Sequence, residues 1–166
     1  NDSVVLRVDF GNASFLFTGD LEKEGIEAML TSYEADLGAF DVDVLKVGHH
    51  GSHNATTQAF VAAVTPKVAI IQAGDSTMSQ AAHSAYSYGH PHQDAVRMLL
   101  DTQHGVSMTR PTKTVPVGVK GANPKTRAPP EFTTITVRRA VYTTGWDGNI
   151  AITANKNGTL KVETGF

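Results

Sequence analysis

Residues 43–52 read DVLKVGHHGS, a short apolar run that ends in two histidines between two glycines. Asp43–Val47 is typical of a short buried strand, so His49 and His50 lie just beyond the end of that strand. Catalytic and ligand-binding groups of α/β sheets collect at the C-terminal ends of strands, where loops open to solvent on a rigid scaffold. The stretch therefore predicts a functional loop at one edge of a sheet.

A second stretch upstream has the same layout. Ser3–Phe10 and Ala13–Phe17 alternate like strands, and Gly11-Asn12 between them predicts a hairpin. Asp20 follows the second of these strands directly. A carboxylate beside imidazoles is a ligand set that Zn, Mn or Fe accepts, so Asp20, His49 and His50 are candidate metal ligands. The alternative is structural, with Asp20 capping the next helix and the histidines exposed to solvent.

The remaining elements alternate between helices and strands. Apolar residues at helical spacing predict helices over Leu21–Tyr33, Thr56–Val64 and Gln93–Leu100. Strands are expected at Lys67–Gln72, Val106–Thr109, Ile135–Val137, Val141–Thr144, Asn149–Ala154 and Thr159–Glu163. This order predicts a single α/β domain over residues 1–166, with a partly antiparallel sheet.

Composition excludes several classes of protein. The 166 residues are 40% hydrophobic and 18% charged, which is ordinary for a globular chain. The chain contains no cysteine, which removes disulfides, thiolate zinc sites and a cysteine nucleophile. The longest apolar run, Ala59–Val64, is too short to span a bilayer, so we expect no transmembrane segment in this chain.

Charge is distributed unevenly along the chain. Residues 1–45 carry ten acidic and two basic residues, a balance of −8, whereas residues 104–140 carry seven basic residues and Glu131, a balance of +6. Five of the seven prolines lie between Pro111 and Pro130, so residues 110–133 are expected to form a Pro/Gly/Lys-rich insertion, extended or mobile, outside the core. The insertion either binds nucleic-acid phosphates or is a solvated loop.

Three motifs together resemble a known family. FLFTGD at 15–20, DVLKVGHHGS at 43–52 and YGHP at 88–91 are similar to the metallo-β-lactamase superfamily. More narrowly, they resemble the hydrolase domain of ComEC-like DNA-uptake proteins. The likeness covers nearly the whole chain apart from residues 76–87 and 110–133.

The resemblance implies a site that holds two divalent metal ions, Zn or Mn. Asp20 matches the carboxylate that bridges the two metals, His49 matches a histidine ligand with His50 as the alternative, and Asp2 lies near a further ligand. Asp20 and His90 are the expected catalytic residues, with His90 on the substrate side or acting as general acid.

The other histidines, His53, His83, His92 and His104, are expected to be ordinary surface residues. Asp41 or Asp43 is expected to orient a ligand histidine. Ser52 is expected to cap the next loop rather than act as a nucleophile. The expected substrate-binding residues are Ser52, Lys113, Lys120, Lys125 and Arg127.

One motif of the family is missing. The His-x-His-x-Asp-His sequence, which supplies most of the family's metal ligands, does not occur in this chain. The resemblance therefore implies the C-terminal half of an αββα sandwich, a mixed sheet with helices on one face, and a start at Asn1 that is internal to a longer protein. The expected partner is a complementary N-terminal half or a second copy, and the chain alone is expected to be inactive.

The implied function is a metal-dependent hydrolase of phosphodiesters in DNA, on the extracellular or periplasmic side of a membrane. Two alternatives stay open. One is a non-catalytic half-domain or interaction module. The other is a metallo-hydrolase of lactone, thioester or phosphocholine ester substrates.

Overall fold

A five-stranded mixed sheet forms the centre of the molecule. The structure is a computed structural model that describes residues 3–74, 84–123, 125–126 and 128–165. The strand order is β1-β2-β3-β4-β7, with β1 antiparallel to β2 and the other neighbours parallel. The bounds of these strands are β1 Leu6–Phe10, β2 Ala13–Phe17, β3 Val44–Lys46, β4 Val68–Ile71 and β7 Val141–Thr143. The predicted α/β class with a partly antiparallel sheet is confirmed.

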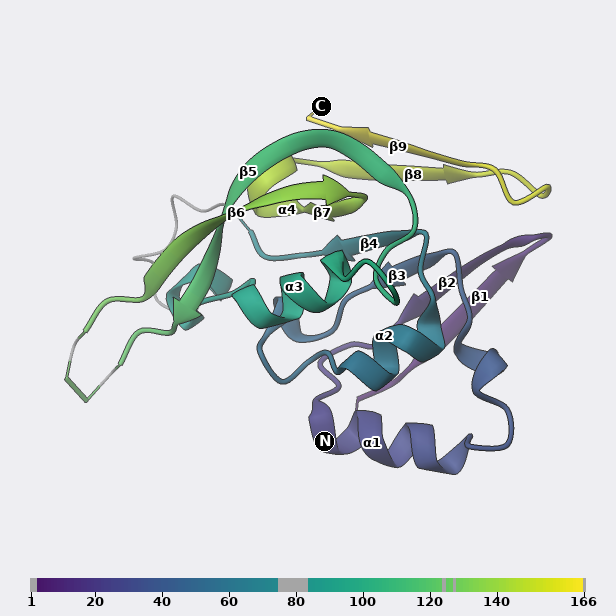
Figure 1. The fold of residues 1–166 in the computed structure, drawn as a ribbon, viewed down its shortest axis with the longest axis horizontal. Helices are drawn as coiled ribbons and strands as arrows, with labels where there is room; N and C mark the ends of the chain where they lie inside the picture. The colour runs from purple at the N-terminus through teal and green to yellow at the C-terminus, as the bar shows by residue number, and fades with distance from the viewer. Residues whose placement is uncertain (1–2, 75–83, 124, 127, 166) are drawn as a thin grey trace.

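The three longer helices lie on one side of this sheet (Figure 1). They are α1 Lys23–Ser32, α2 Gln58–Val64 and α3 Gln93–Leu100; shorter turns are η1 Leu37–Phe40, η2 His49–Gly51, η4 Ala85–Tyr88 and α4 Thr144–Asp147. Register partners share a face, so Leu16, Leu45 and Ala69 point the same way, and each is at most 2% exposed. None of the helices in the described ranges is both long and apolar enough to cross a membrane.

Residues 110–133 differ from the expectation. Much of this segment belongs to a two-stranded hairpin of β5 Thr109–Lys120 and β6 Glu131–Arg139, and Val115 and Val117 are buried in the core. The predicted separate strand at Val106–Thr109 is instead the approach to β5. Proline is tolerated in strands at a sheet edge, and both strands of a two-stranded hairpin are edges. The prediction of an insertion outside the core, which was based on these prolines, was therefore wrong.

An ion network ties β5 to the far edge of the main sheet. Arg110 Nη1 and Nη2 donate to the two carboxylate oxygens of Asp147 at 2.8 and 2.6 Å, and Lys113 Nζ lies 2.9 Å from Oδ1. The Arg110 guanidinium also stacks 4.2 Å from the centre of the Tyr142 ring. Burial opposes ionisation of Asp147, but the hydrogen bonds from Arg110 and Lys113 outweigh it and hold the pKa of Asp147 below that of an ordinary aspartate.

The second face of the main sheet exposes apolar side chains near its β1 edge. Leu6, Val8 and Phe10 of β1 are 41–54% exposed, and Phe17, the register partner of Leu6, is 41% exposed. We call these four residues the apolar face. A second hairpin, β8 Ile150–Ala154 with β9 Leu160–Thr164, reaches the β1–β2 turn at its tip, where Asn12 N donates to Lys156 O at 2.8 Å. The β1–β2 and β8–β9 hairpins diverge from their neighbouring tips in the shape of a V (Figure 1).

The buried position of β5 leads to a stability prediction. Val117→Ala should lower the free energy of unfolding by about 1–3 kcal/mol, because Val117 is fully buried and its truncation leaves a cavity. Val119→Ala on the same strand is the matched control, since Val119 is 39% exposed, and it should change stability by less than about 0.5 kcal/mol. Urea denaturation measures both values. Equal effects of the two substitutions would mean that β5 does not pack into the core.

Candidate functional site

The carboxyl ends of three neighbouring parallel strands meet at one edge of the main sheet. Asp20 follows β2, His49 and His50 follow β3, and Gln72 follows β4. All four residues line one cavity of about 1070 Å³, the edge cavity, together with Glu22, His90, His92, Tyr88 and Lys120 among others. Asp20 and the paired histidines therefore lie at the same sheet edge, as predicted, and a separation of a few ångströms between them stays a prediction. Their role as metal ligands stays a prediction.

The backbone at the two histidines is strained. His49 and His50 have φ values of 41° and 55°, in the left-handed region that non-glycine residues rarely adopt. Each such residue costs roughly 1–3 kcal/mol and persists only where the surrounding structure enforces it. Hydrogen bonds from His49 N to Gly19 O at 3.0 Å and from Gly51 N to Gly48 O at 2.8 Å hold this turn. In an extended strand two successive side chains would point to opposite faces, whereas both histidines here line the edge cavity.

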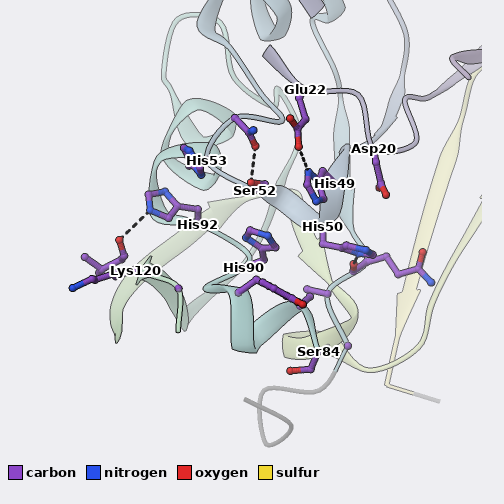
Figure 2. Close-up of a pocket in the computed structure, with 18 residues that line it drawn as sticks. Asp20, Glu22, His49, His50, Ser52, His53, Ser84, His90, His92 and Lys120 are labelled. Atoms are coloured by element: carbon purple, nitrogen blue, oxygen red, sulfur yellow. Dashed lines mark hydrogen bonds and ion pairs between the residues drawn. The ribbon is translucent and has the colours of Figure 1, made fainter. Parts of the chain in front are cut away.

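Both histidine rings are oriented through Nδ1. The His50 Nδ1–H donates to the carbonyl oxygen of Gln72 at 2.5 Å, which leaves Nε2 as the nitrogen that can accept a ligand. His49 Nδ1 lies 2.9 Å from Glu22 Oε1, an ion-pair contact that falls outside linear hydrogen-bond geometry (Figure 2). A ring held at one nitrogen by a carbonyl or carboxylate is the usual arrangement of a metal-binding histidine.

Glu22, which was not predicted, is the carboxylate beside His49, and the prediction of Asp41 or Asp43 in this role was wrong. Asp43 lies 2.6 Å from Lys67 Nζ and accepts from Ser14 N, and Asp41 accepts from the Thr65 hydroxyl. The expectation of Asp41 or Asp43 was based on closeness in sequence, whereas Glu22 reaches His49 from the N-cap of α1. Because Glu22 is that N-cap, the alternative in which Asp20 caps the helix is not supported. The sequence signal that could have identified Glu22 is its place as an acidic residue two positions after Asp20.

His90 lies deeper in the edge cavity, with its ring centre 5.7 Å from that of His49. Burial, with a smaller contribution from the His49 charge, lowers the pKa of His90 to about 4. Its Nδ1 is buried without a hydrogen-bond partner in the described part of the chain. At neutral pH the ring is therefore uncharged, which argues against a general acid. The assignment of His90 as catalytic stays a prediction.

Two further histidines line the edge cavity, the half-buried His92 and the exposed His53. His92 Nδ1 accepts from Asp94 N at 3.3 Å at the start of α3, and its Nε2–H donates to Val119 O at 3.1 Å. His92 thus joins α3 to β5. The ring of His53 lies 5.6 Å from the ring of His92. The expectation of ordinary surface residues was wrong for His92, which is half-buried, while His83 lies outside the described residues.

The predicted substrate-binding residues, together with the predicted metal ligand Asp2, fall into four groups. Ser52 is buried and its hydroxyl donates to Asn54 Oδ1 at 2.7 Å, which fits a cap of the following turn. Lys113 is a correction, because its ammonium is bound to Asp147 and to the carbonyl of Trp146. Lys120 lines the edge cavity and Lys125 is exposed. Asp2 and Arg127 lie outside the described residues.

The donor types suit a divalent metal, but their arrangement gives only part of a site. A catalytic zinc needs about three protein ligands plus a water molecule. Among the residues that the structure describes, no three His, Cys, Asp or Glu side chains converge closely enough to hold one ion. Asp20, His49 and His50 have the donor atoms of metal ligands, but by themselves they do not form a complete site.

Comparison with known proteins agrees with the motifs and with this site. Residues 1–75, which contain Asp20, His49 and His50, match the sequence model of the metallo-beta-lactamase superfamily. This part of the chain is similar to that superfamily, and the relatives below support the same assignment. Within it, the chain is ComEC-like. It is 37% identical over 110 residues to ComE operon protein 3 of Bacillus subtilis (strain 168) and 35% identical over 108 residues to competence protein ComA of Neisseria gonorrhoeae.

These relatives are much longer than the aligned region. The alignments cover 66% and 65% of this chain, but only 12% and 14% of the two relatives. Recombination protein 2 of Haemophilus influenzae is 42% identical over 72 residues, which are 43% of this chain and 8% of that protein. No solved structure matches the chain.

The environment of His90 gives a testable titration. We expect the His90 ring to stay neutral from pH 8 down to about pH 5 and to protonate only near pH 4. Because the folded-state pKa lies below the ordinary 6.5, the unfolded chain binds the proton more readily, and this group lowers stability as pH falls from 6.5 towards 4. Two-dimensional NMR of ¹⁵N-labelled histidine measures the titration, with His90→Gln used to assign the signal. A midpoint above pH 6 would contradict the prediction.

Proposed function

We propose that the edge cavity is part of a metal-dependent phosphodiesterase site that acts on DNA. The observation that carries this proposal is the pair of histidines that share the edge cavity with Asp20. Gln72 O binds Nδ1 of His50, which leaves Nε2 of that ring for a metal, and Nδ1 of His49 lies against Glu22. Two zinc or manganese ions would be held by Asp20, His49 and His50 together with ligands from outside the described residues. When bound, such ions lower the pKa of a water molecule and polarise the phosphate.

This chain's own residues prepare that chemistry in three ways. The strained turn at His49 and His50 fixes both rings before any metal arrives, which reduces the reorganisation needed on binding. Glu22 places a negative charge against one ring and strengthens it as a ligand. The neutral ring of His90 sits beside His49 and can offer a hydrogen bond to substrate without adding positive charge.

We further propose that a complementary N-terminal half of the same fold, or a second copy of the chain, covers the apolar face and completes the site. This proposal is supported by four apolar side chains that are 41–54% exposed together on one face of the sheet, Leu6, Val8, Phe10 and Phe17. Contiguous exposed apolar side chains of this kind mark interaction surfaces. The same face adjoins the β2 end at which Asp20 emerges, so a partner seated there would reach the edge cavity.

DNA as substrate is supported by a relative. ComA of Neisseria gonorrhoeae is named a competence protein, and the aligned region covers 14% of it. Lys120 at the cavity and exposed Lys125 supply positive charge for a phosphate backbone. A periplasmic or extracellular location follows only from this proposed role.

The proposal is tested by hydrolysis of bis(p-nitrophenyl) phosphate with added Mn²⁺ or Zn²⁺. As a monomer, the 166-residue chain should show little turnover, and it should gain turnover when a complementary N-terminal half of the fold is supplied in trans or when two copies associate. In that mixture Asp20→Asn and His50→Ala should each lower the rate at least tenfold, whereas His104→Ala, an exposed histidine outside the cavity, should leave it unchanged.

Two results would overturn the proposal. Full metal-dependent turnover by the monomeric chain would exclude shared ligands. Turnover of a lactone or phosphocholine ester at rates well above that of the phosphodiester would replace DNA as the substrate.

A further inference from the structure

Tyr88 places an exposed aromatic ring in the wall of the edge cavity. It is 54% exposed, and its ring is stacked on that of His90 with centres 6.3 Å apart and planes inclined by 25°. Large aromatic side chains are usually buried or anchored at an interface. An aromatic ring that is stacked on a neighbour and open to a cavity is a surface on which a planar ligand can stack.

Lys120 lies in the same wall. Its side chain is 60% exposed, and its closest carboxylate, Glu131 Oε1, is 3.8 Å away with 63% exposure. An exposed pair at this separation contributes little, so the ammonium can exchange this partner for a phosphate. Figure 2 shows Lys120 and Asp20 at opposite ends of the edge cavity, with the histidines between them.

Close backbone packing fixes Tyr88 and Lys120 relative to each other. A Cβ on Gly118 would lie 1.8 Å from Gly89 O, and one on Gly121 would lie 2.7 Å from Tyr88 O. Only glycine permits these approaches. Hydrogen bonds from Gly118 N to Pro91 O at 2.8 Å and from Ala122 N to Ser87 O at 2.9 Å hold the two segments together. The relative position of the two backbone segments that carry the aromatic ring and the ammonium is therefore set by the fold.

We propose that Tyr88 and Lys120 form a nucleotide subsite for single-stranded nucleic acid, in which a base stacks on the Tyr88 ring and its phosphate lies beside the Lys120 ammonium. An aromatic platform next to a cation is the combination by which proteins bind single strands, and it accepts any base because each has a π face. A paired base is stacked within its duplex and cannot reach the ring. The subsite rests on the proposed function for its substrate, and it deepens that function by naming an unpaired strand.

Binding without turnover tests the subsite separately from catalysis. The 166-residue chain is titrated, in EDTA, into a fluorescein-labelled single-stranded deoxyoligonucleotide of mixed sequence, and anisotropy is measured. Tyr88→Ala should weaken binding about tenfold, and Tyr88→Phe should stay within about twofold of the parent chain, because stacking needs the ring and not the hydroxyl. Lys120→Ala should weaken binding and reduce the slope of log K against log salt by about 0.7.

Two matched controls separate the subsite from general surface effects. Tyr33→Ala removes a tyrosine that is 49% exposed beyond the end of α1, and Lys161→Ala removes an exposed lysine of β9. Both should leave affinity unchanged. Circular dichroism of every variant checks that the fold is retained.

The outcomes distinguish this inference from the proposed function. Binding that depends on Tyr88 supports the subsite even if no hydrolysis is found. No binding of the single strand, equal affinity for a duplex of the same sequence, or an equal loss in Tyr88→Phe and Tyr88→Ala would each overturn it. Metal-dependent hydrolysis that is retained while Tyr88→Ala leaves affinity unchanged would overturn the subsite and leave the proposed function standing.

Discussion

The parallel pairing of β2, β3 and β4 is the constraint on which the rest of the molecule depends. Parallel neighbours all end at the same edge of the sheet, so the three loops that follow these strands lie together there. Asp20, the two histidines and Gln72 meet because each follows one of these strands. The hydrophobic burial of Leu16, Leu45 and Ala69 holds the strands in register, and a slip of one residue would turn these side chains to the other face.

The second constraint is the attachment of the β5–β6 hairpin. Arg110 and Lys113 fix its start to Asp147, and the glycine contacts at Gly118 and Gly121 fix the end of β5 against residues 88–91. Buried ion pairs contribute little net stability, but removing one partner leaves an uncompensated charge. This network therefore serves mainly to define one position for the hairpin. That position turns a proline-rich segment into a wall of the edge cavity, with Lys120 at its rim.

The molecule combines a rigid cavity with an apolar face that the chain itself leaves open. The strained turn at His49 and His50 places two imidazole rings in the cavity, while the face at β1 exposes Phe10 and Phe17 to solvent. The two features adjoin at the β1–β2 hairpin, where Asp20 N is held by the Ser3 hydroxyl at 2.9 Å. A partner on the apolar face and a completed metal site would therefore stabilise each other, since each would restrain the same loop.

The sequence alone determined the class of fold, most strand positions and the residues at the sheet edge. Apolar alternation and the polar residues that end each run are local signals, so Asp20, His49 and His50 could be found without a structure. Glu22, the role of Lys113 and the wall formed by Tyr88 and Lys120 depend on contacts between segments far apart in sequence. Only tertiary structure decided these, because a carboxylate, a lysine or a glycine has the same local signature whether it faces solvent or meets a distant strand.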